Sequence, residues 1–279
     1  MLACQRDLVH LPEGLHYLNC AYMAPLLKSV EAAGVEVLRR RRDPAAITAP
    51  DFFTGPNRAR ALFAELVGGA ASRMAIIPGV SYGMATVAKN VTPRAGQNVV
   101  VAHAQFPSNV YGWRRKCEES GAVLRVVAPP DAAEGRAREW NARLLEAIDR
   151  DTALVTLGNV HWTDGTRFDL EAIGERAREV GALLVIDGTQ SVGAMPFDLR
   201  RVRPDALICA AYKWLLGPYT IGLAYYGEHF DGGVPLEETW LARRGSDNFA
   251  RLVDYTDDYE SGAARFDMAE RASFVLIRC

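Results

Sequence analysis

Short apolar runs alternate with helix-length segments over most of this chain. Runs of this length suit strands buried on both faces of a parallel sheet, and they are too short to cross a membrane. The expected strands are residues 74–77, 98–102, 123–127, 153–157, 183–186, 206–209 and 221–225. The expected helices between them are residues 81–90, 109–120, 138–148 and 169–180. This order predicts an α/β fold with a mostly parallel seven-stranded sheet between helices.

The flanking segments are less regular. A helix is expected from Pro25, because proline suits a first helical turn, and another over residues 56–67, before a glycine pair. The last two connections between strands are too short for full helical crossovers, so one edge of the sheet is expected to be antiparallel. The chain is divided into an N-terminal segment and helix (1–50), a large ligand-binding domain (51–235) and the start of an incomplete C-terminal region (236–279).

Composition argues against several classes of protein. Of the 279 residues, 49% are hydrophobic, which is enough for a core, and the net charge of −2 gives no basic surface for nucleic acid. The cysteines and histidines show no metal-binding spacing, so we expect reduced thiols and no metal. Four consecutive arginines, 39–42, are interpreted as the solvated end of a helix. Without a signal peptide or a long apolar segment, we expect a cytoplasmic protein that does not bind membranes.

An acid and an amine follow two strands of the expected sheet. Asp187 ends the run 183–186, and Lys213 follows the run 206–209 among apolar neighbours. Open α/β sheets bind ligands at the carboxyl ends of their strands, so these two side chains are expected to share a ligand. Neither a glycine-rich dinucleotide fingerprint nor a phosphate loop of the Gly-Lys-Ser type occurs, which makes a nucleotide the weaker interpretation.

Pyridoxal 5'-phosphate (PLP) suits the pair better. Its aldehyde forms a Schiff base with an amine whose pKa burial lowers, and a carboxylate keeps its pyridine nitrogen protonated. Lys213 and Asp187 meet these two needs. Phosphate binds at helix N-termini, and the turn 78–83, which contains Ser81, links a strand to a helix. Phe106, after the strand 98–102, is expected to stack on the ring.

Each of these residues also has a purely structural interpretation. Asp187 and Ser81 could be helix caps, and Ser81 could be both a cap and a phosphate ligand. Lys213 could be a surface lysine whose stem packs on apolar neighbours. Phe106 could serve only the core, and Tyr212, if buried, would need a hydrogen-bond partner whatever the function.

Several motifs in the right order resemble the class V aminotransferase family of fold-type I PLP enzymes. The motifs are residues 17–22, 106–111, 161–165, 185–191 and 212–218. Within the family, the resemblance leans toward the isopenicillin N epimerase-like and selenocysteine lyase-like branch, with kynureninase nearby. The resemblance implies the large domain of a fold-type I PLP-dependent transferase, with the small C-terminal domain largely missing.

The resemblance implies a role for each residue that carries it. Lys213 would be catalytic, as the Schiff-base lysine that moves the proton at the substrate α-carbon. Asp187 would pair with the pyridine nitrogen, and Gln190 would donate to the ring oxygen.

The remaining cofactor contacts would come from four other residues. Ser81 and Tyr82, with the amides of their turn, would bind the phosphate. Tyr212 would add a further hydrogen bond to that phosphate, and Phe106 would stack on the ring.

As a whole, the resemblance implies a PLP-dependent enzyme that acts on an amino acid as an aminotransferase, an epimerase or a lyase. Relatives are homodimers, so we expect a homodimer in which residues 240–266 reach toward the partner. The alternative is a truncated, catalytically impaired relative that binds the cofactor or only keeps the fold.

The sequence also departs from the family pattern. Cysteine desulfurases have His where this chain has Tyr212 and Asn where it has Trp162, so both differences count against a desulfurase. Relatives continue into a C-terminal domain that supplies an arginine for the substrate carboxylate. Cys279 is not expected to be the desulfurase nucleophile, and the apolar run 274–277 is expected to be exposed.

Overall fold

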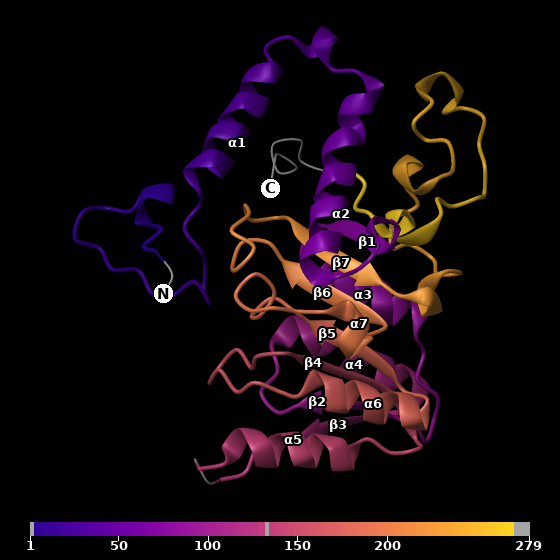
Figure 1. The fold of residues 1–279 in the computed structure, drawn as a ribbon. Helices are drawn as coiled ribbons and strands as arrows, with labels where there is room; N and C mark the ends of the chain where they lie inside the picture. The colour runs from indigo at the N-terminus through magenta and orange to yellow at the C-terminus, as the bar shows by residue number, and fades with distance from the viewer. Residues whose placement is uncertain (1–2, 132–133, 271–279) are drawn as a thin grey trace.

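Within residues 3–131 and 134–270, which the computed structural model describes, the chain forms one seven-stranded sheet. Its strands are β1 (Met74–Ile77), β2 (Asn98–Ala102), β3 (Val123–Val127), β4 (Thr152–Gly158), β5 (Leu183–Asp187), β6 (Ala206–Ala210) and β7 (Gly222–Tyr226). Their order in space is β1-β7-β6-β5-β4-β2-β3 (Figure 1). The neighbours from β6 to β3 pair in parallel, so the predicted α/β fold with a mostly parallel sheet is confirmed.

The antiparallel strand lies inside the sheet and not at its edge. β7 pairs antiparallel with β6 on one side and with β1 on the other, so β1 is the edge strand. The connection from β6 to β7 is short and returns the chain beside the strand it has just left. The connection from β5 to β6 is also short, yet with the one-turn helix α7 (Leu199–Val202) it still gives a parallel pair. The pairing at the β1 edge of the sheet is therefore antiparallel, as predicted, although the antiparallel strand itself, β7, lies one position inside.

Helices cover both faces of the sheet. Besides α7, these helices are α2 (Thr54–Val67), α3 (Val80–Asn90), α4 (Tyr111–Ser120), α5 (Arg136–Ala147) and α6 (Leu170–Val180), whereas α1 (Lys28–Arg40) stands apart from the sheet (Figure 1). Side chains from α2, α5, α6 and α7 form one core with one face of the sheet, and those from α3 and α4 form a second core with the other face. Successive strand residues serve opposite cores; Ile76 belongs to the first and Ile77 to the second.

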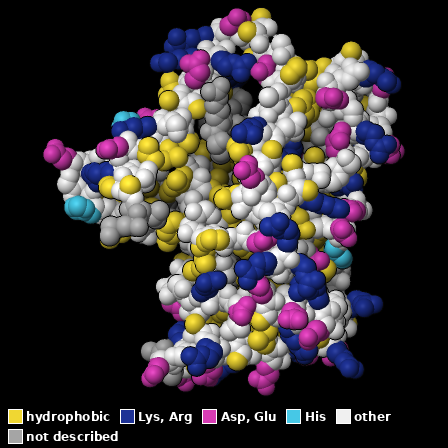
Figure 2. Space-filling view, in the orientation of Figure 1, with side chains coloured by type: hydrophobic (Ala, Val, Ile, Leu, Met, Phe, Trp, Pro, Cys, Tyr) yellow, Lys and Arg dark blue, Asp and Glu magenta, His cyan; other side chains and the backbone are white. Residues whose placement is uncertain are grey.

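The N-terminal part projects from this layered body. Figure 1 shows α1 and the segment before it standing to the left of the sheet, and Figure 2 shows hydrophobic side chains gathered on this projection. No residue of α1 is buried. The helix begins at Lys28 and not at Pro25, because Leu27 is extended and bridges to Val9. Residues 39–42 are all exposed, which confirms the interpretation of the four arginines.

The segment before residue 270 packs against the edge strand β1. The carboxylate of Asp267 accepts from the amide of Ile76 at 2.8 Å, and the amide of Met268 donates to the carbonyl of Ile76 at 2.9 Å. Asp267 also forms a buried ion pair with Arg60 of α2. Nearby Phe266 is almost fully buried in the second core. This segment is therefore part of the folded body.

Two expectations from the sequence fall on the end of the chain. The apolar run 274–277 and Cys279 both lie outside the described residues. None of the helices within the described ranges combines the length and the apolar character that crossing a membrane requires.

Candidate active site

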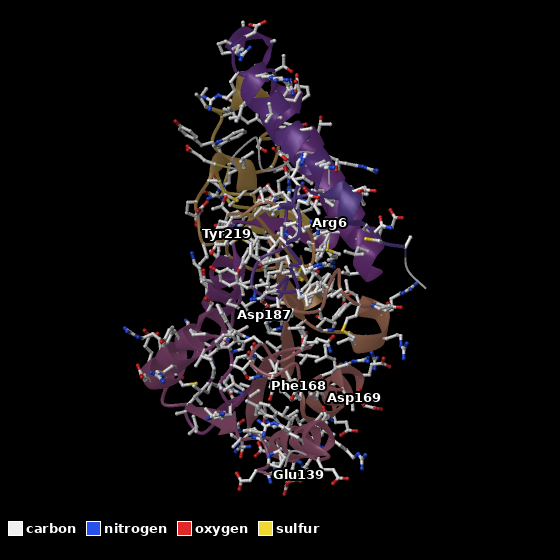
Figure 3. All side chains as sticks on the ribbon, turned by 90° about the vertical axis from the view of Figure 1, so that its left-hand side faces the viewer. Arg6, Glu139, Phe168, Asp169, Asp187 and Tyr219 are labelled. Carbon is white, nitrogen blue, oxygen red and sulfur yellow. The ribbon has the colours of Figure 1, made fainter. Side chains whose placement is uncertain are left out.

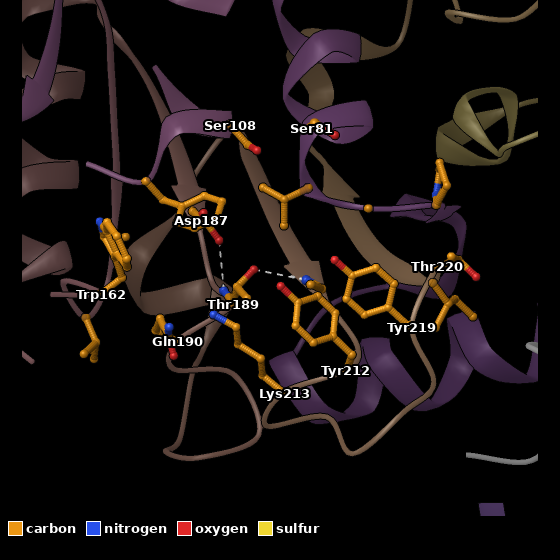
Figure 4. A pocket seen from close by; sticks show the side chains of 18 of the residues that line it. Ser81, Ser108, Trp162, Asp187, Thr189, Gln190, Tyr212, Lys213, Tyr219 and Thr220 are labelled. Carbon is orange, nitrogen blue, oxygen red and sulfur yellow. Dashed lines mark hydrogen bonds between the residues drawn. The ribbon is translucent and has the colours of Figure 1, made fainter. Parts of the chain in front are cut away.

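A pocket of about 300 Å³ opens at the carboxyl ends of the parallel strands. It is lined by the turns that follow β1, β2, β4, β5 and β6, and by the end of the loop that leads into β7. This is the place where open α/β sheets bind ligands, and the volume falls at the lower end of the range of roughly 300–1,000 Å³ for small-molecule sites. Figure 3 shows two of its residues, Asp187 and Tyr219, near the middle of the molecule. Figure 4 shows the lining side chains.

Asp187 is a buried acid at the base of the pocket. It is the last residue of β5 and only 8% exposed. Its carboxylate accepts from the amide of Thr189 at 3.0 Å, and the Thr189 hydroxyl in turn accepts from the amide of Ala210 at 3.1 Å. Burial raises the pKa of Asp187, and the hydrogen bonds from Thr189 and the charge of Lys213 offset that rise only in part. A positively charged group beside this carboxylate would stabilise its ionised form.

Lys213 lines the same pocket and is 7% exposed. Its Nζ lies 6.0 Å from the ring centroid of Phe106 and 5.8 Å from that of Tyr212. Burial lowers its pKa, while the charge of Asp187 raises it to a smaller extent. The acid and the amine thus line one cavity, and the interpretation of Lys213 as a surface lysine is wrong.

Phe106 is held by its neighbours in the pocket wall. Its ring meets that of Trp162 edge-on, with centroids 5.3 Å apart and planes at 88°. The indole Nε1 of Trp162 donates to the carbonyl of Ala104 at 2.8 Å. Beside it, buried His161 donates from Nε2 to the carbonyl of His103 at 3.0 Å. These contacts join the loop after β4 to the loop after β2 and fix the position of the Phe106 ring.

Hydroxyl groups gather at the other end of the pocket. Ser81 lies in the first turn of α3, whose first amides have no partner within the helix. The N-cap of α3 is Gly79, with no side-chain cap hydrogen bond, so the interpretation of Ser81 as an N-cap is wrong. The rings of Tyr212 and Tyr219 are in contact, with centroids 4.5 Å apart and planes tilted by 40°, and Thr220 follows them in the lining. Such an end suits an anion, because amides and hydroxyls converge there.

The side-chain amide of Gln190 is largely engaged within the chain. Its Nε2 donates to the carbonyl of Ala21 at 2.9 Å, and its Oε1 accepts from the indole of Trp214 at 3.1 Å. The amide of Ala24 also donates to the carbonyl of Tyr212 at 3.0 Å. The N-terminal segment is therefore attached to the wall of the pocket. One N–H of Gln190 remains for a ligand.

The sequence model of the aminotransferase class-V family matches residues 48–238, more than half of the chain. The chain belongs to this family. The sequence resemblance and the expected fold-type I domain are thereby confirmed, and the cofactor of such enzymes is PLP, which a structural neighbour, a mutant of C-DES, carries covalently linked to glycine.

Relatives within the family have different activities. The uncharacterized aminotransferase YcbU of Bacillus subtilis (strain 168) is 29% identical over 66% of this chain and 48% of its own length. The isopenicillin N epimerase of Amycolatopsis lactamdurans is 26% identical over 87% of this chain and 62% of its own length. Probable cysteine desulfurases also match. That of Methanothermobacter thermautotrophicus is 32% identical over 62% of this chain and 42% of its own length. The chain thus spans about half the length of the curated relatives it matches.

Solved structures share the fold at low sequence identity. The apo cysteine desulfurase from Thermococcus onnurineus NA1 superposes with a TM-score of 0.79 at 18% identity, over 99% of this chain and 69% of that chain. The cystine C-S lyase C-DES, in complex with its reaction product cysteine persulfide, superposes with a TM-score of 0.81 at 19% identity, over 93% of this chain and 68% of that chain.

Six of the seven residues predicted from the family pattern line the pocket, and Tyr82 does not. Its side chain, on α3, packs against the second core, and burial raises the pKa of its phenol. Ser81 and Tyr82 are consecutive in a helix, so their side chains point about 100° apart and cannot both face one cavity. A contact between the Tyr82 side chain and a phosphate is therefore not expected; only its backbone amide stays a candidate.

The sequence did not identify every residue of the pocket. Trp162 was recognised only as a departure from the desulfurase pattern, and Gln105, Ser108, Tyr219 and Thr220 were not singled out. Ser108 lies two residues after Phe106 in the matched motif, so that spacing was an available signal. Thr220 has a φ of 66°, a backbone state that its residue type does not suggest. Within the described residues, no group of three or more His, Cys, Asp or Glu side chains could hold a metal.

The segment expected to reach a partner subunit packs on its own chain at both ends. Trp240 contacts Phe52 and Phe249 edge-on, and Phe266 is buried. The homodimer, and any contribution of residues 240–266 to a partner, remain predictions.

Proposed function

We propose that this chain binds PLP in the pocket and acts on an amino acid, with Lys213 as the covalent attachment point of the cofactor. The observation that carries the proposal is the burial of Lys213 and Asp187 in one cavity at the ends of β5 and β6. A buried carboxylate with a raised pKa is costly unless a cation lies beside it. The protonated pyridine nitrogen of PLP is such a cation, so this pair fits the cofactor.

The other lining residues fit the remaining parts of the cofactor. Phe106, fixed by Trp162, presents a ring face to a planar ligand. The phosphate would lie among the first amides of α3, Ser81 and the hydroxyls of Tyr212 and Tyr219. The free N–H of Gln190 would donate to the ring oxygen.

When bound, the cofactor supplies an electron sink for charge that develops at the substrate α-carbon. Lys213 is the base in reach of that carbon, because its amine lines the pocket and burial favours its neutral form. Asp187 would keep a negative charge beside the pyridine nitrogen, and both Asp187 and Lys213 are buried. Aminotransferase, epimerase and lyase reactions all begin with such a proton transfer, and the similar relatives include each of these kinds.

Reconstitution with PLP tests the proposal directly. We expect the purified chain to turn yellow on addition of PLP, and borohydride followed by peptide mapping to label Lys213. The variant K213A should remain unlabelled, whereas K28A, which removes an exposed lysine at the start of α1, should label normally. A colourless chain with no label at Lys213 would contradict the proposal. A chain that takes up PLP and converts no amino acid would instead match the impaired relative considered above.

A further inference from the structure

The two ends of the pocket differ in chemistry. Figure 4 shows Tyr219 and Thr220 at one end and Trp162 at the other, with Asp187 and Lys213 between them. The first end is rich in hydroxyl groups. The second is formed by the indole of Trp162, which contacts the ring of Phe106, with Gln190 beside it, so it presents aromatic carbon (Figure 4). A phosphate and a substrate side chain would therefore occupy opposite ends.

Trp162 presents a fixed apolar surface to this second end. It is 44% exposed, although two contacts hold it: the hydrogen bond from Nε1 to the carbonyl of Ala104 and the edge-on contact with Phe106. Because the one N–H of the indole is already used, the exposed part of the side chain is aromatic carbon. A rigid, exposed aromatic surface in a pocket favours apolar and aromatic groups.

The charges in the pocket support the same conclusion. Among the described residues that line it, the charged groups are Asp187 and Lys213 alone, and the proposed function assigns both to the cofactor. A charged substrate side chain at the Trp162 end would therefore meet no opposite charge in the described lining. An apolar side chain needs none and can pack against the indole.

We propose, on the basis of the proposed function, that Trp162 determines specificity for the substrate side chain and that the preferred substrates are amino acids with aromatic or large aliphatic side chains. Trp162 acts here by contact with the side chain and not as an acid or a base. The small, polar cysteine is a poor match for this surface.

The experiment uses the chain loaded with PLP, and cofactor uptake is measured first. Phenylalanine, leucine, alanine, cysteine and aspartate are then titrated by calorimetry. In parallel, the indole N–H signals are followed by NMR, with W162F assigning the Trp162 signal. We expect phenylalanine and leucine to bind more tightly than the other three and to shift the Trp162 signal. The indole of Trp240, 36% exposed in a separate aromatic cluster, should not respond.

The variants separate the contact from a general structural role. W162A should weaken phenylalanine binding about tenfold and alanine binding less than twofold, because only the larger side chain reaches the indole. W162F keeps an aromatic surface without the Ala104 hydrogen bond, so it should retain the preference; W240F should change neither affinity. Two results would overturn this inference while leaving the proposed function intact, provided that PLP uptake is normal. One is equal affinity of the unmodified chain for phenylalanine and alanine. The other is an equal loss of affinity for both amino acids in W162A.

If W162A does not fold, the NMR titration of the unmodified chain still tests whether phenylalanine contacts Trp162. Failure of PLP uptake would contradict the proposed function instead.

Discussion

The side chain of Gln190 donates to the main-chain carbonyl of Ala21, a residue 169 positions earlier in the chain. The same side chain accepts from the indole of Trp214. Gln190 thus connects the projecting N-terminal segment to the loop that follows Lys213. The geometry of the pocket wall depends on a contact between distant parts of the sequence.

Replacing Gln190 by alanine should release the N-terminal segment. We expect Q190A to lower the free energy of unfolding by about 1 kcal/mol, the usual net value of a hydrogen bond, and to speed proteolysis near residue 21. Limited proteolysis and chemical denaturation measure both effects. Q5A is the matched control, since Gln5 lies in the same segment and its side chain donates to the nearby carbonyl of Ala3. Equal proteolysis of Q190A and Q5A would contradict the prediction.

Asp187 should affect stability and cofactor binding in opposite directions. Because its folded-state pKa is raised, the folded chain binds more protons than the unfolded chain, and stability falls as the pH rises from 3.8 through that raised pKa. At neutral pH, D187N removes this cost and should stabilise the chain without PLP. The same change removes the charge opposite the pyridine nitrogen and should weaken PLP binding roughly tenfold to a hundredfold. Thermal unfolding without PLP and a PLP titration test the two signs, and a loss of stability in D187N would refute the first.

The amine of Lys213 should react at lower pH than a free lysine. Burial lowers its pKa below 10.5, so the neutral, nucleophilic form appears at lower pH. The rate of PLP attachment, followed by absorbance against pH, should therefore reach half its maximum below pH 10.5. In D187N the charge that raises this pKa is absent, so the midpoint should move to still lower pH. An unchanged or higher midpoint in D187N would be inconsistent with the coupling between these groups.

The buried ion pair of Arg60 and Asp267 should be the costliest of the pairs described here to break. We expect D267A to destabilise the chain by about 3–5 kcal/mol, since it leaves the guanidinium buried without its partner and removes an acceptor from the amide of Ile76. The exposed pair of Arg251 and Asp254 is the control, and D254A should cost less than about 1 kcal/mol. Urea unfolding of both variants gives the comparison; similar costs would show that burial does not set the value of this pair.

The strands were predictable because a strand that is buried on both faces has apolar residues at successive positions. The predicted and observed bounds of β1, β2 and β3 coincide. The same periodicity does not report where a helix finally packs. The apolar residues of α1 predicted a helix, yet none of them is buried, because the contact surface of a helix depends on tertiary structure.

Some contacts in the site could not be predicted from local sequence patterns. Asp187 and Lys213 could be paired because parallel strands end at one edge of the sheet. The contact of Trp162 with Ala104 joins two loops 58 residues apart, and no spacing along the chain encodes it. The position of β7 inside the sheet has the same cause, since its second partner, β1, comes from the beginning of the domain.

The contact of Asp267 and Met268 with Ile76 has a consequence for solubility. An open sheet edge offers unpaired amides and carbonyls to other chains, and such edges promote strand-to-strand aggregation. Here the amide and the carbonyl of Ile76 are already occupied. At the opposite edge, β3 carries Arg125 in its centre, bound to Asp149, and a charge in that position discourages pairing. The two edges of the sheet thus oppose self-association in different ways: the backbone groups of Ile76 are occupied at the β1 edge, and Arg125 places a charge at the β3 edge.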